Sequence, residues 1–181
     1  MKNLVIHPED KSTDFLEPIY GKVEDKTVIT KNASVNDLNT LIKNSDRVMM
    51  MGHGSPSGLF SVRMFEQNKP YVISKEETDI LKEQDQNIYI WCNADRFVEE
   101  YDLKGFYSGM FISEVGEAMF CGVRQANKKM VNESNNKFSE IVGNHINLPK
   151  EELYEIVIKE YGELAKTNPV AKFNLDRLFV K

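Results

Sequence analysis

The stretch Arg47-Val48-Met49-Met50-Met51-Gly52-His53-Gly54 decides how this chain of 181 residues folds. Its four consecutive apolar residues run directly into a Gly-His-Gly turn. A short continuous apolar run that ends in glycine is typical of a strand buried on both faces of a parallel sheet, because such a strand has no polar face. We therefore predict a strand over 47–51, with His53 at its carboxyl end.

Similar apolar segments occur on both sides of this stretch, over 3–7, 26–30, 87–92 and 105–112. Residues 34–43 carry apolar side chains at helical spacing, and Ser34 or Asn32 can cap the start of that helix. Strand, helix and strand in this order form a right-handed βαβ unit. The sequence therefore predicts an α/β fold with a mostly parallel central sheet flanked by helices.

The later part of the chain reads as helical. We predict helices over 74–82, 135–145 and 149–166, and a helix that starts within 113–118 with Ser113 as its cap. The tail, 168–180, is expected to be an added strand or an arm. Because the chain shows no linker, repeat or low-complexity tract, residues 1–181 are expected to form a single domain with a helical C-terminal third.

Composition narrows the possible partners. The chain has 28 acidic and 23 basic residues, a net charge of -5, which does not suit a nucleic-acid-binding surface. No apolar run is long enough for a membrane span or a signal peptide, so we expect a soluble cytoplasmic protein without a membrane partner. Two cysteines and three histidines show no zinc-binding spacing, so neither a metal nor another cofactor is expected.

Three reactive side chains fall where predicted strands end. His7 closes the first strand, His53 follows the third and Cys92 closes the fourth. Ligands of open parallel sheets bind beyond the carboxyl ends of the strands. An imidazole beside a thiol favours the thiolate, which attacks carbonyl carbons, and backbone N–H groups around Gly54 and Cys92 can hold the developing oxyanion. These residues suggest nucleophilic catalysis by a Cys–His pair.

The segments Met49-Met50-Met51-Gly52-His53-Gly54 and Ile88-Tyr89-Ile90-Trp91-Cys92 resemble the caspase-like cysteine peptidase clan. This clan includes caspases, legumain, gingipain, clostripain, separase and bacterial CHAT-type domains. The resemblance covers roughly residues 45–125. It implies a caspase-like three-layer sandwich that hydrolyses a peptide or related acyl bond, with Cys92 as nucleophile, His53 as base and the Gly54 amide in the oxyanion hole.

The chain departs from that family at three points around Cys92. The family usually has a small residue directly before the nucleophile, and Trp91 stands there. Members that cleave after Arg or Lys often carry an acid two residues before it, where this chain has Ile90, so the sequence does not support a basic substrate preference. The segment 93–95 differs from the Gly- or Ser-containing stretch that commonly follows.

Other residues are expected to line the same pocket or to bind a ligand there: His7, Gly52, Ser55, Ser57, Gly58, Trp91, Asn93 and Asp95. Two alternatives remain open. A non-catalytic protein of this fold would hold a small ligand such as a nucleotide, with the loop 52–58 cradling a phosphate through its amides. A pseudo-enzyme would act through a protein partner or as a homo-oligomer. His7 and Cys121 also have simple structural interpretations, as a strand-end histidine and a core cysteine.

Overall fold

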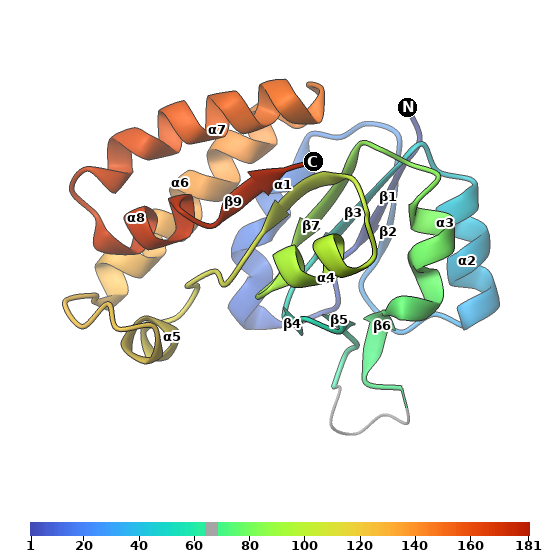
Figure 1. Cartoon of the computed structure of the whole chain (residues 1–181), viewed down its shortest axis with the longest axis horizontal. Coiled ribbons are helices and arrows are strands. Elements are labelled where there is room, and N and C mark those ends of the chain that lie inside the picture. The colour runs from blue at the N-terminus through green and yellow to red at the C-terminus, as the bar shows by residue number, and fades with distance from the viewer. Residues whose placement is uncertain (64–68) are drawn as a thin grey trace.

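The computed structural model describes residues 1–63 and 69–181, and its centre is a mostly parallel six-stranded sheet (Figure 1). The sheet has the strand order β2-β1-β3-β7-β8-β9. Its members are β1 (Asn3–Ile6), β2 (Lys26–Ile29), β3 (Arg47–Met51), β7 (Asn87–Ile90), β8 (Gly105–Ser108) and β9 (Leu178–Val180). Only β9 runs antiparallel to its neighbour. The predicted fold class is therefore confirmed.

Helices cover both faces of this sheet because its strands send alternate side chains to opposite sides. One face packs against a 3-10 turn (Lys11–Leu16), α1 (Glu17–Gly21), α6 (Lys128–His145) and α7 (Lys150–Ala165). The other packs against α2 (Val35–Lys43), α3 (Thr78–Leu81) and α4 (Ala94–Glu100). Along β3, Met49 and Met51 join the first layer, whereas Val48 and Met50 join the second. This alternation places a hydrophobic core on each side of the sheet.

The chain leaves β3 into a second, smaller sheet that the sequence did not predict. It consists of β4 (Gly54–Ser55), β5 (Gly58–Phe60) and β6 (Tyr71–Ile73), all antiparallel. Gly58 has φ +139, and a Cβ there would lie 2.0 Å from the Ile73 carbonyl oxygen. The segment 52–58 is therefore the first hairpin of this sheet, closed by a glycine that no other residue can replace without strain.

The predicted helical C-terminal region is confirmed, with changed boundaries. Helix α6 begins at Lys128, where the Asn127 side chain caps Met130, and α5 (Val115–Phe120) has Glu114 rather than Ser113 as its N-cap. The tail is a short helix, α8 (Pro169–Leu175), followed by β9 at the sheet edge. Helix α6 thus starts seven residues before the predicted residue 135, and the N-cap of α5 lies one residue after the predicted Ser113.

Two predictions about the strands are wrong in detail. Strand β2 lies at the edge of the sheet, so Thr27 and Val28 are exposed rather than buried on both faces. Strands β7 and β8 end at Ile90 and Ser108, earlier than predicted. The apolar character that continues beyond them belongs to packed loops, and Cys92 therefore lies just outside its strand.

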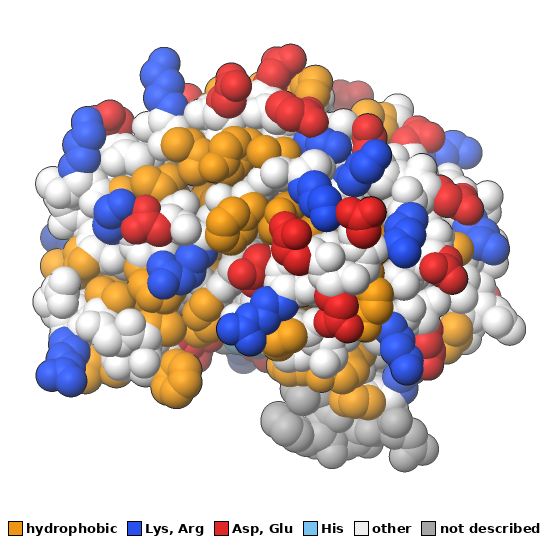
Figure 2. Space-filling view, viewed as in Figure 1, with side chains coloured by type: hydrophobic (Ala, Val, Ile, Leu, Met, Phe, Trp, Pro, Cys, Tyr) orange, Lys and Arg blue, Asp and Glu red, His pale blue; other side chains and the backbone are white. Residues whose placement is uncertain are grey.

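The described helices include none that is both long and apolar enough to cross a membrane. On the face shown in Figure 2, acidic and basic side chains are interspersed and form no large patch of one sign.

Close packing of α6 on α1 depends on Gly143. A Cβ at Gly143 would lie 2.3 Å from the Pro18 carbonyl oxygen, whereas a Cβ at Gly162 of α7 would meet only Leu175 at 3.8 Å. We expect Gly143→Ala to lower the free energy of unfolding by about 1–3 kcal/mol through overpacking. Gly162→Ala should instead raise it by up to about 1 kcal/mol, because alanine favours helix. Urea denaturation of both variants measures this, and equal effects would contradict the close approach.

Candidate functional site

The register of the central sheet brings His53 and Cys92 to the same place. Strands β3 and β7 pair in parallel with Met51 opposite Ile90, and the Gly52 N–H continues the ladder to the Ile90 carbonyl at 3.0 Å. His53 and Cys92 each follow this last pair by two residues, and both line the same cavities at this edge of the sheet. The sequence separation of 39 residues is thereby reduced to neighbouring positions at the carboxyl edge of the sheet.

Both side chains also belong to the same side of the sheet. Met49, Met51, Ile88 and Ile90 all pack in the core beneath α1 and α6. Just beyond these strands, His53 and Cys92 border a small cavity together with Leu16 and Phe111, which belong to the same core. His53 and Cys92 accordingly line one cavity of about 460 Å³.

The cavity has apolar walls with charged groups at its margin. Its lining consists of Pro8, Glu9, Asp10, His53, Gly54, Phe60, Ser61, Val62, Arg63, Cys92, Met110 and Glu117. A volume of roughly 300–1,000 Å³ is usual for sites that bind small molecules. The site combines a thiol, an imidazole and space for a substrate, which are the groups that acyl transfer requires.

Two backbone positions with positive φ flank the reactive pair. Gly52, directly before His53, has φ +142, and Asn93, directly after Cys92, has φ +66. Asparagine tolerates the left-handed conformation better than most residues. The Asn93 turn redirects the chain from β7 into α4, with the Ala94 N–H bonded to the Trp91 carbonyl at 3.2 Å. Cys92 therefore lies in the tight turn between β7 and α4, where it lines the cavity.

Trp91 has a structural role that explains the large residue before the cysteine. Its indole Nε1 donates a hydrogen bond to the Ser55 carbonyl at 3.1 Å, and its ring packs on Gly54. A Cβ at Gly54 would lie 2.2 Å from the Trp91 ring. The tryptophan thus fixes the end of β7 to the start of β4, which holds the His53 segment against the Cys92 corner.

The His53 ring is oriented by residues that the sequence analysis missed. Its Nε2 lies 2.6 Å from Ser12 Oγ, and the Ser12 hydroxyl donates to Asp10 Oδ1, also at 2.6 Å. Since that hydroxyl proton is directed to Asp10, Nε2 must carry its own proton and donate it to Ser12, which leaves Nδ1 as the basic nitrogen. The Ser12 hydroxyl and amide also hold the pKa of the Asp10 carboxyl below its usual value.

A sequence signal for this arrangement existed. Asp10 is the N-cap of the 3-10 turn that follows β1 and accepts a hydrogen bond from the Ser12 N–H at 2.9 Å. An Asp followed two residues later by Ser is a common start of a helical turn. The link from that cap to His53 spans 41 residues and is visible only in the fold.

The Cys92 thiol is held in its protonated form in this structure. It donates to the Phe111 carbonyl at 3.5 Å, and burial raises its pKa to about 11, with a further contribution from the negative charge of Glu117. Within residues 1–63 and 69–181, no hydrogen bond joins Cys92 to His53. The two groups are therefore gathered in one cavity without yet forming an ion pair.

His7 has a structural role. The side chain is buried, with Nδ1 bonded to the Tyr20 hydroxyl at 3.0 Å and Nε2 to Thr13 Oγ1 at 3.1 Å. Burial lowers its pKa, so the neutral ring is favoured. With both nitrogens occupied, His7 anchors the turn after β1 and has no nitrogen available for a ligand.

The remaining predicted residues divide into two groups. Gly52 and Trp91 border a separate cavity of about 20 Å³, which His53 and Cys92 also line. They therefore lie next to the candidate site without lining its larger cavity. Ser55, Ser57, Gly58, Asn93 and Asp95 do not line the larger cavity. Glu117 and Met110 do line it and were not predicted, because they come from the segment after β8, which no local pattern links to Cys92.

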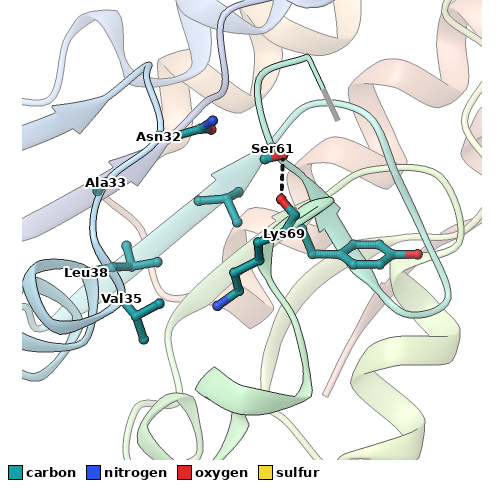
Figure 3. Close-up of a pocket in the computed structure, with 8 residues that line it drawn as sticks. Asn32, Ala33, Val35, Leu38, Ser61 and Lys69 are labelled. Atoms are coloured by element: carbon teal, nitrogen blue, oxygen red, sulfur yellow. Dashed lines mark hydrogen bonds between the residues drawn. The ribbon is translucent and has the colours of Figure 1, made fainter. Parts of the chain in front are cut away.

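A second cavity, of about 150 Å³, lies between the start of α2 and the small sheet (Figure 3). Ser61 there donates to the Lys69 carbonyl at 3.0 Å, and Lys69 Nζ is bonded to Glu76 at 2.8 Å and to Glu77 at 3.4 Å. The polar groups of this small cavity are thus engaged with the protein itself, and it does not reach Cys92 or His53.

Comparison with protein-family models, curated proteins and solved structures found no match. Among the residues that the structure describes, no three His, Cys, Asp or Glu side chains are placed to hold a metal ion.

The protonated state of Cys92 can be measured directly. Because its pKa is raised to about 11, the rate of alkylation by iodoacetamide in the Cys121→Ser variant should rise about tenfold per pH unit between pH 7 and 10. Mass spectrometry of the alkylated protein gives the rate, and the double variant Cys92→Ser/Cys121→Ser gives the background from side chains other than cysteine. A plateau below pH 9 would show that the free thiol is already activated.

Proposed function

We propose that this protein is a cysteine hydrolase that cleaves a peptide or related acyl bond with Cys92 as nucleophile and His53 as general base. The observation that carries the proposal is the placement of both residues at adjacent strand ends, on the same side of the sheet, in one cavity. A thiol and an imidazole in such a position are the pair required for acyl transfer.

In the proposed reaction, the bound substrate displaces the contact between the Cys92 thiol and the Phe111 carbonyl. His53 Nδ1 takes the thiol proton, and the sulfur forms a bond to the substrate carbonyl carbon. The carbon–nitrogen bond then breaks, and the amine leaves with the proton from His53. Water, deprotonated by His53, hydrolyses the thioester, which releases the acid and restores the thiol.

The Gly54 amide is suited to hold the oxyanion. The Phe60 N–H bonds to the His53 carbonyl at 2.9 Å, and Gly54 lies opposite Leu59 in the antiparallel pair of β4 and β5. Hydrogen-bonded and non-bonded pairs alternate in such a ladder, so the Gly54 N–H points away from β5. Gly54 also lines the cavity with Cys92, which leaves its N–H available to a developing negative charge.

Ser12 and Asp10 act as positioning residues in this scheme. The hydrogen bond from Nε2 to Ser12 fixes the tautomer of His53, and the Asp10 carboxylate holds the Ser12 hydroxyl in place by accepting its proton.

A second candidate function is the binding of a small-molecule or peptide ligand without catalysis. The raised pKa of the Cys92 thiol and its bond to the Phe111 carbonyl favour this alternative, because an inert thiol has those properties. A phosphate ligand such as a nucleotide is disfavoured, since Glu9, Asp10 and Glu117 all line the cavity.

Digestion of a proteome-derived peptide library, analysed by mass spectrometry, distinguishes the two functions. The wild-type protein should generate new peptide ends, and Cys92→Ala or His53→Ala should reduce this cleavage about a thousandfold or more. Cys121→Ala is the matched control and should retain it. Cleavage that survives in Cys92→Ala would contradict the proposal, as would a folded wild-type protein that cleaves no peptide.

Once a substrate is found, Ser12→Ala tests the positioning of the base. Loss of one hydrogen bond to His53 should lower kcat about tenfold with little change in KM. Ser12→Thr keeps the hydroxyl and should restore most of kcat. If Ser12→Ala instead changes KM alone, Ser12 contacts the substrate and does not orient His53.

A further inference from the structure

We propose that Glu117 makes the Cys92 cavity selective for substrates with a positively charged group, such as the side chain of a lysine or arginine beside the scissile bond. This inference rests on the proposed function, because it names the substrate class of the same site. It assigns to Glu117 a role in specificity and not in the chemical steps.

The carboxylate of Glu117 is fixed in position by one of its two oxygens. Oε2 accepts hydrogen bonds from the Ser113 N–H at 2.7 Å, the Ser113 hydroxyl at 2.9 Å and the Glu114 N–H at 3.1 Å. Among the described residues, nothing donates a hydrogen bond to Oε1. Glu117 is half-buried and lines the cavity. It therefore presents a preoriented negative charge with one oxygen left for a ligand.

This charge reaches the reactive sulfur. Burial raises the pKa of the Cys92 thiol, and the negative charge of Glu117, which lines the same cavity, raises it further. A negative charge near Cys92 opposes loss of the thiol proton, and the proposed reaction needs that proton to leave. A cation bound between Glu117 and the substrate carbonyl would neutralise that carboxylate, so the thiol would lose its proton more readily once the correct substrate is in place.

The rest of the lining suits a cationic side chain with an apolar stem. Among the described lining residues, Glu9 and Asp10 add two carboxylates to that of Glu117, and Arg63 contributes one guanidinium. The adjoining cavity, which Glu9 and Asp10 also line, includes Lys11 and Lys31. Phe60 and Met110 provide apolar wall. Lysine and arginine place their methylene groups on apolar surface and their charge in a polar region, which is the arrangement this cavity offers.

The sequence did not indicate this preference because the position two residues before Cys92 is Ile90, an apolar residue. The Ile90 side chain is buried in the core below α1 and α6 and is not available to a substrate. In the structure the acid comes instead from α5, which follows β8 and lies at the same end of the sheet.

Charged thiol reagents test the inference without any need for turnover. In the Cys121→Ser background, Cys92 is modified with methanethiosulfonates that carry an ethylammonium, a methyl or an ethylsulfonate group, and each rate is divided by that of a free model thiol. We expect the ammonium-to-sulfonate ratio to fall about tenfold in Glu117→Gln. Because all three reagents attack the same thiolate, changes in its pKa cancel in the ratio.

Glu114→Gln is the matched control, since it removes an equal charge from an exposed neighbour that does not line the cavity. It should keep the wild-type ratio. Glutamine at position 117 can still accept the Ser113 hydrogen bonds, and urea denaturation checks that the variant is folded. An unchanged ratio in Glu117→Gln, or an equal fall in Glu114→Gln, would overturn the inference.

Peptide substrates then separate this inference from the proposed function. Peptides that differ only in having Lys, Arg, norleucine or Glu before the scissile bond are compared in wild type and Glu117→Gln. Cys92-dependent cleavage with no preference for Lys or Arg would refute the role of Glu117 and leave the hydrolase intact. Charge-selective labelling of Cys92 without cleavage of any peptide would refute the hydrolase and leave the charge selection of the cavity intact.

Discussion

The parallel pairing of β3 with β7 is the constraint on which the candidate site depends. The register that sets Met51 opposite Ile90 also decides where the chain leaves each strand, and it carries His53 and Cys92 to neighbouring corners of one edge. A slip of one residue in this pairing would turn one of the two side chains to the opposite face of the sheet. The buried side chains of both strands resist such a slip, because it would move Met49 and Met51 out of one core and into the other. Packing of the core therefore aligns the reactive pair.

Around that pair, the protein uses different interactions to hold each group. Trp91 holds the small sheet against the end of β7, because its indole N–H donates to the Ser55 carbonyl and its ring packs directly on Gly54. Ser12 and Asp10 hold the imidazole from the turn after β1. The thiol, in contrast, is bonded to the Phe111 carbonyl, and burial together with the charge of Glu117 raises its pKa, which favours the protonated form. An oriented imidazole and a protonated thiol fit our proposal of a hydrolase in which the thiol reacts only when a ligand alters the surroundings of the sulfur.

Much of the fold was predictable because its signals are local. Strand β3 has the predicted bounds, and α2 begins after its Ser34 cap, since an apolar run and a cap act within a few residues. The strand-end rule pointed to His53 and Cys92, which line one cavity in the structure. It also pointed to His7, whose two nitrogens are taken by Tyr20 and Thr13, because the rule locates a residue and says nothing of its partners.

The sequence by itself determined the fold class, the parallel strands and the presence of a thiol and an imidazole just after two of those strands, because these follow from local hydrophobic pattern and residue type. Only the tertiary structure decided that Ser12 orients His53, that Phe111 holds the thiol and that Glu117 lines the cavity. Each of these contacts joins segments far apart in the chain, and its strength depends on distance and burial. The spacing of residues along the sequence gives neither quantity. The orientation of His53 and the protonation of Cys92 are therefore decided only when the sheet and its connecting loops have folded.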